Sequence, residues 1–71
     1  MKISKKNITV QEELELFDKG LVIRRAWIRP PGKWEYYTVK IGHSESIAIT
    51  SYPRAAYNAG VRWVTHQEKK P

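Results

Sequence analysis

The stretch LVIRRAWIRPPGKWEYYTVKI, residues 21–41, decides the fold. Residues 21–29 are rich in side chains that favour strands, and residues 34–41 alternate between apolar and polar side chains. The four residues between them, 30–33, include two prolines and a glycine, which favour a turn. The stretch therefore predicts a β-hairpin whose loop is residues 30–33.

The two faces of this hairpin differ in chemistry. The predicted loop sets Arg29 opposite Trp34, and Trp27 opposite Tyr36. One face then alternates cations with aromatic rings and carries Arg25, Trp27, Arg29, Trp34, Tyr36 and Lys40. The other face is mainly apolar, which predicts that it faces the core; it carries Val22, Ala26, Ile28, Tyr37, Val39 and Ile41.

A helix is predicted before the hairpin. Thr9 and Glu12 have the spacing of a capping box, and Gly20 is a typical helix stop. Three apolar residues recur between them at helical intervals, namely Val10, Leu14 and Phe17.

After the hairpin, residues 47–50 predict a third strand, and Ser51 and Pro53 predict the start of a second helix ending at Gly60. Residues 61–65 alternate again and predict a last strand. The expected fold is one small α+β domain, residues 1–71, of order α-β-β-β-α-β, with an antiparallel sheet of three to four strands packed with two short helices. Residues 1–6 and 67–71 are expected to be flexible basic tails.

Composition narrows the class of protein. The chain has 71 residues and no cysteine, which excludes a disulfide framework and a thiolate zinc site. No apolar run approaches the roughly 20 residues of a membrane span, and no signal-peptide pattern follows Met1. We therefore expect a cytoplasmic protein without a membrane partner.

Catalytic residue types occur together only once, as His43, Ser44 and Glu45 in the turn that follows the hairpin. Neighbours in a tight turn cannot converge on one reacting atom. His66 is distant in sequence, and two histidines with no cysteine and no acid at ligand spacing make no metal site. We expect no enzyme activity, no metal and no cofactor.

The formal charge of +6 is concentrated in the body of the chain. Residues 19–66 contain eight Lys or Arg against two acids, which favours an anionic partner, either nucleic acid or an acidic protein surface. Arg can read guanine edges, Lys can contact phosphates and exposed rings can stack on bases. The leading hypothesis is a non-enzymatic nucleic-acid-binding module, for DNA rather than RNA. Its predicted contact residues are Arg25, Trp27, Arg29, Lys33, Trp34, Tyr36 and Lys40, with Arg54 and Arg62 as a secondary basic surface.

Two alternatives use the same residues. The first helix could cover the aromatic rings through Val10, Leu14 and Phe17, which would make them part of the core. The face could also bind a protein, because Trp, Tyr and Arg dominate hot spots, as in a regulator or inhibitor of the phage or plasmid accessory type. The chain could be a monomer, or a homodimer paired through a sheet edge at residues 21–29 or 61–65.

Two families share parts of this pattern. The order helix, three strands, helix resembles double-stranded-RNA-binding domains, although the chain has only Arg54 where those domains open their final helix with a basic stretch. The run from Trp34 to Lys40, followed by residues 47–50 and an Ala-rich helix, is similar to the arm-site-binding domains of phage integrases, which imply a three-stranded sheet against one helix. Likeness of fold does not transfer function.

Overall fold

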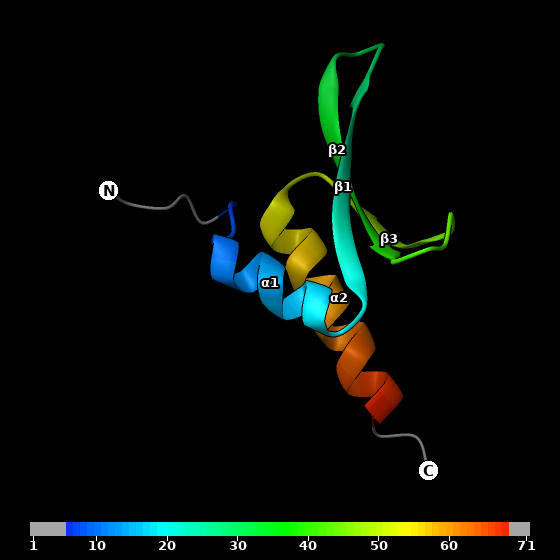
Figure 1. Ribbon diagram of the computed structural model, residues 1–71. Helices are drawn as coiled ribbons and strands as arrows, with labels where there is room; N and C mark the ends of the chain where they lie inside the picture. Colours follow the sequence, from blue (N-terminus) through cyan, green and yellow to red (C-terminus); the bar gives the residue numbers. More distant parts are fainter. Residues whose placement is uncertain (1–5, 69–71) are drawn as a thin grey trace.

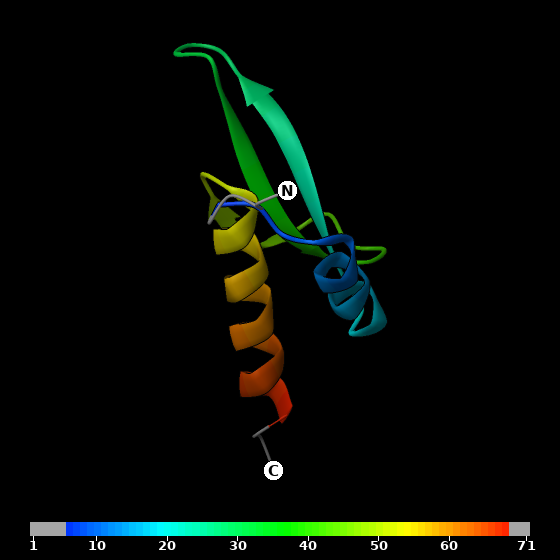
Figure 2. The same cartoon turned by 90° about the vertical axis from the view of Figure 1, so that its left-hand side faces the viewer.

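The computed structural model describes residues 6–68 and forms a small α+β domain. Its elements are, in order, α1 (Val10–Asp18), β1 (Leu21–Ile28), β2 (Lys33–Lys40), β3 (Ser46–Thr50) and α2 (Pro53–Glu68). The three strands form one antiparallel sheet of order β1-β2-β3. The predicted fold class is thus confirmed. Both helices pack at the base of the sheet, and the β1–β2 hairpin extends past them (Figures 1 and 2).

The predicted last strand at residues 61–65 is wrong, because α2 continues through Gly60 to Glu68. Gly60 is a point of close approach: a Cβ atom there would lie 3.1 Å from Leu16 Cδ2, 3.2 Å from Thr38 Cγ2 and 3.3 Å from Leu21 Cδ1. Because Gly60 has no side chain, it lets α2 lie close to the sheet, and the helix does not end there.

Parts of both predicted tails lie within the described residues. Gln67 and Glu68 belong to α2. The carbonyl of Lys6 accepts a hydrogen bond of 2.8 Å from the backbone N–H of Arg54. The remaining tail residues, 1–5 and 69–71, lie outside the described part of the chain.

The hairpin loop is residues 29–32, one position earlier than predicted. Trp27 pairs with Trp34 and Arg25 with Tyr36, so each β1 residue meets a partner two positions from the predicted one. Gly32, with φ of 95°, donates its N–H to the carbonyl of Ile28 and closes the loop before β2 begins. Because side chains alternate with a period of two, this shift keeps each side chain on its predicted face.

The core lies on the opposite face from the one predicted. Leu21 and Thr38 are fully buried and belong to the face that carries the cations and aromatic rings. They pack against Ala56 and Gly60 of α2, and the Thr38 hydroxyl donates a 2.7 Å hydrogen bond to the Ala56 carbonyl. Small residues on α2 allow this approach, which the alternation of the strands alone does not predict. Of the predicted core face, only Val39 is buried, whereas Val22, Ala26, Ile28 and Tyr37 are partly exposed and Ile41 is exposed.

Helix α1 has the predicted capping box, with Glu12 N–H bonded to Thr9 Oγ1 and Thr9 N–H bonded to Glu12 Oε1. Its orientation differs from the prediction, because Leu16 alone of the helix is buried. The apolar residues expected to cover the sheet are instead exposed, Val10 at 71%, Leu14 at 56% and Phe17 at 60%. The alternative is therefore wrong for these three residues. The base of the aromatic face is covered instead through Leu16, Ala56 and Gly60, while Trp27 and Trp34 stay exposed.

Candidate functional site

The candidate site is the distal part of the hairpin, which we call the tip cluster: Arg25, Trp27, Arg29 and Trp34. These residues lie on the two strands and the loop that extend past both helices (Figure 2). The rings of Trp27 and Trp34 are 47% and 43% exposed, and they contact each other edge to face with centroids 5.2 Å apart. Cross-strand contact orders these rings while leaving much of their surface open to a partner.

Two arginines, Arg25 and Arg29, lie on the same part of the hairpin as these rings. The guanidinium of Arg25 lies 5.0 Å from the centroid of the Trp34 ring, a cation–π distance. Arg25 and Arg29 are both exposed. Arg29 lies in the loop at the far end of the hairpin, where it extends the positive surface beyond the rings.

The hairpin carries one acid, Glu35. It lies on the face opposite Trp27 and Trp34, where Tyr37 and Lys33 contact its carboxylate. The Tyr37 hydroxyl donates a 2.7 Å hydrogen bond to Glu35 Oε1, which raises the pKa of Tyr37. Lys33 Nζ lies 3.9 Å from Glu35 Oε2. Within residues 6–68, neither Arg25 nor Arg29 forms an ion pair.

The predicted contact set is brought together only in part. Arg25, Trp27, Trp34 and Tyr36 share one face of the hairpin, with Tyr36 partly buried opposite Arg25. Lys33 shares neither that face nor the loop. Lys40 lies at the base, its ammonium 5.6 Å from the ring of Trp63 on α2. About 20 Å of strand separates it from the tip, so Lys40 is not part of the cluster.

Of the secondary basic residues, Arg54 has a structural role. Its two terminal nitrogens donate to the Glu12 carboxylate at 2.6 and 2.9 Å, a bidentate pair that joins α2 to α1. The pair lowers the pKa of Glu12 to about 2 and raises the pKa of Arg54. Arg62 is exposed on α2, where it lines a hollow beside Trp63, far along the helix from this pair.

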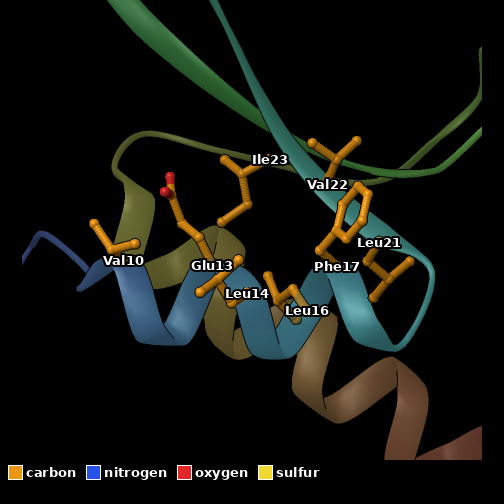
Figure 3. A pocket seen from close by; sticks show the side chains of 8 residues that line it. All are labelled: Val10, Glu13, Leu14, Leu16, Phe17, Leu21, Val22 and Ile23. Atoms are coloured by element: carbon orange, nitrogen blue, oxygen red, sulfur yellow. The ribbon is translucent and has the colours of Figure 1, made fainter.

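A second surface was not foreseen. A hollow of about 240 Å³ separates α1 from β1 (Figure 3) and is lined by Val10, Glu13, Leu14, Leu16, Phe17, Leu21, Val22 and Ile23. The helical spacing of its apolar residues is visible in the sequence. That spacing cannot tell an inward stripe from an outward one, so the sequence leaves open whether the stripe covers the sheet.

Residues 6–68 contain no group of three or more His, Cys, Asp or Glu side chains placed to hold a metal ion. None of the described helices has the length and apolar character needed to cross a membrane. No protein-family model, no curated protein and no solved structure matches the chain. Function must therefore be argued from the surfaces themselves.

Proposed function

We propose that the protein binds nucleic acid through the tip cluster, with DNA as the preferred partner. The observation that carries the proposal is the exposed pair Trp27 and Trp34, flanked by Arg25 and Arg29 on a ribbon that extends past the rest of the domain.

The shape of the hairpin supports DNA over RNA. The major groove of B-form DNA is about 12 Å wide and admits a two-stranded β-ribbon, whereas the major groove of A-form RNA is deep and narrow. In such a groove Arg29, at the end of the loop, is placed to contact the O6 and N7 atoms of guanine. The exposed tryptophan rings can stack on unpaired bases at a distorted or single-stranded site.

Charge supports the same partner. Within the described residues neither Arg25 nor Arg29 forms an ion pair, and neither does Arg24, which lies on the opposite face of β1. Each phosphate neutralised by such a cation adds about 0.9 to the slope of log affinity against log salt. Two contacts of this kind predict a slope of about 1.8, so the affinity falls with salt without being lost at about 150 mM.

The experiment is fluorescence anisotropy of labelled duplex DNA, single-stranded DNA and duplex RNA, titrated with the protein at low salt and at about 150 mM salt. We expect binding that survives the higher salt and prefers DNA. Binding that is absent, or that disappears equally for all three nucleic acids, would leave only a nonspecific positive field and would refute the proposal.

The second candidate is a regulator that binds an acidic protein surface through the same residues. Exposed Trp and Arg side chains are the commonest hot-spot types, which favours this candidate over an enzyme. It predicts that Trp34→Ala abolishes capture of the partner protein and leaves the weak, salt-sensitive affinity for nucleic acid unchanged.

A further inference from the structure

Strand β1 is an edge of the sheet, and its outer side has unpaired backbone groups. The Ile41 N–H donates to the Gly20 carbonyl at 2.9 Å, and this pair continues the β1–β2 register. Hydrogen-bonded pairs alternate along an antiparallel ladder, so the even residues of β1 turn their backbone groups towards β2. The odd residues Ile23, Arg25 and Trp27 turn theirs outward, and within residues 6–68 these groups bond no other segment.

The apolar stripe of α1 lies beside this open edge. Val10, Leu14 and Phe17 point into the hollow that Ile23 closes from the side of β1 (Figure 3). Three large apolar side chains exposed together on one helix face are unusual for an isolated small domain. An open strand edge next to such a stripe can accept another β-strand, which would pair with the edge and cover the stripe.

Charge selects the occupant of this surface. Glu13 lines the hollow and Asp18 ends the same helix, so the α1 side is acidic. The hairpin tip of this chain carries the complementary features, with basic Arg29 beside apolar Pro30 and Pro31. Pairing α1 with a second α1 would instead bring like charges together, which is unfavourable.

We propose that two copies of the chain associate through antiparallel β1–β1 pairing, with the hairpin tip of each copy lying on the apolar stripe of the other. Odd residues must oppose odd residues, because only these have outward backbone groups. Among such registers, one sets Arg25 opposite Trp27 of the second copy and Ile23 opposite Arg29. This register keeps the Arg25 side chains of the two copies from facing each other. It also brings Arg29 of one copy towards Glu13 of the other, and Glu13 lines both of the hollows that Ile23 lines.

The dimer joins two sheets into one of six strands. A two-fold axis normal to the sheet keeps Trp27 and Trp34 of both copies on the same face. Arg29 and the loop contact the second copy, so the dimer and the insertion of the tip into a DNA groove exclude each other. The proposal concerns self-association and stands whether or not the chain binds nucleic acid.

The first test is sedimentation velocity across a wide range of protein concentration, without nucleic acid. We expect the parent to form a dimer and Leu14→Glu to raise the dimer dissociation constant at least about tenfold. Leu14 is exposed, so the substitution spares the core, and circular dichroism checks the fold. The matched control is Ile49→Glu on β3, another exposed apolar residue, at 62%, which should dimerise like the parent.

The second test is a charge exchange. Glu13→Lys and Arg29→Glu should each weaken the dimer, and the double variant should recover affinity because the pair is restored with reversed signs. Amide hydrogen exchange at Arg25 and Trp27 should slow as the protein concentration rises. A parent that stays monomeric at every concentration, or equal effects of Leu14→Glu and Ile49→Glu, would overturn the proposal and leave the surface to a foreign partner.

Discussion

Replacing Gly60 with alanine tests the packing of α2 on the sheet. Within a helix, alanine is favoured over glycine by about 1 kcal/mol. Here the added Cβ would lie 3.1–3.3 Å from three side-chain carbons, of Leu16, Thr38 and Leu21. These residues are almost completely buried and have little room to move, and overpacking of this kind costs about 1–3 kcal/mol. We therefore expect Gly60→Ala to destabilise the protein by about 1 kcal/mol.

The assay is urea unfolding followed by tryptophan fluorescence, with thermal unfolding as a second measure. A loss of 1 kcal/mol corresponds to a fall of about 4–8 °C in Tm for a domain of this size. The control is Asn58→Ala, because Asn58 is exposed on the same helix and should gain about 0.5 kcal/mol from helix propensity alone. If Gly60→Ala is stabilised as much as the control, the close approach of α2 to the sheet is refuted.

Three further predictions address other contacts. Thr38→Val removes the hydroxyl that bonds the Ala56 carbonyl and should cost about 1 kcal/mol in urea unfolding; an unchanged midpoint would mean that the bond contributes nothing. The pKa of Glu12 is about 2 in the folded protein against 4.5 ordinarily, so its contribution to stability is complete above pH 4.5 and lost as pH falls towards 2. Glu12→Gln, which keeps the capping box, should therefore flatten the fall of Tm across that window, and parallel curves for parent and variant would contradict this. Trp34→Leu should weaken binding to single-stranded DNA by about tenfold or more in anisotropy titrations, since stacking contributes about 1–3 kcal/mol per base; parent-like affinity would remove the ring from the interface.

Local sequence signals predicted the elements well. The capping box at Thr9 and Glu12 and the proline-glycine loop depend on residues close together in the chain, and both are present. The sets of side chains that share a face of the hairpin were also predicted correctly, because the error in register was an even number of residues.

Long-range packing explains what the sequence could not predict. The orientation of α1 depends on the bidentate bond between Glu12 and Arg54, 42 residues apart. Glu12 and Glu15 of α1 bond Arg54 and Tyr57 of α2, Leu16 is the buried residue of α1, and Leu14 is exposed. A glycine within a helical pattern is also a typical helix stop, so the sequence alone cannot assign the role of Gly60. Its close approach to Leu21 identifies it as a contact point between α2 and the sheet.

The predicted contact residues lie in more than one part of the structure. Alternation predicts that Arg25, Trp27 and Trp34 share one face, but the pairing of Trp27 with Trp34 depends on the register, which was predicted two residues off. Lys40 and Arg54 were included because they are basic, but each is engaged elsewhere: Lys40 over Trp63, and Arg54 with an acid. Partners that lie on α2 or α1 cannot be assigned from a single strand.

The most direct test of the proposed function compares two variants that each remove one positive charge, Arg29→Gln at the hairpin tip and Arg62→Gln on α2. Both remove one exposed cation, so a nonspecific positive field would lose the same affinity from either. The measurement is the salt dependence of affinity for duplex DNA by anisotropy. We expect Arg29→Gln to weaken binding and lower the salt slope by about one unit, with Arg62→Gln close to the parent. Equal effects of the two variants, or none from either, would contradict the tip cluster as the nucleic-acid interface.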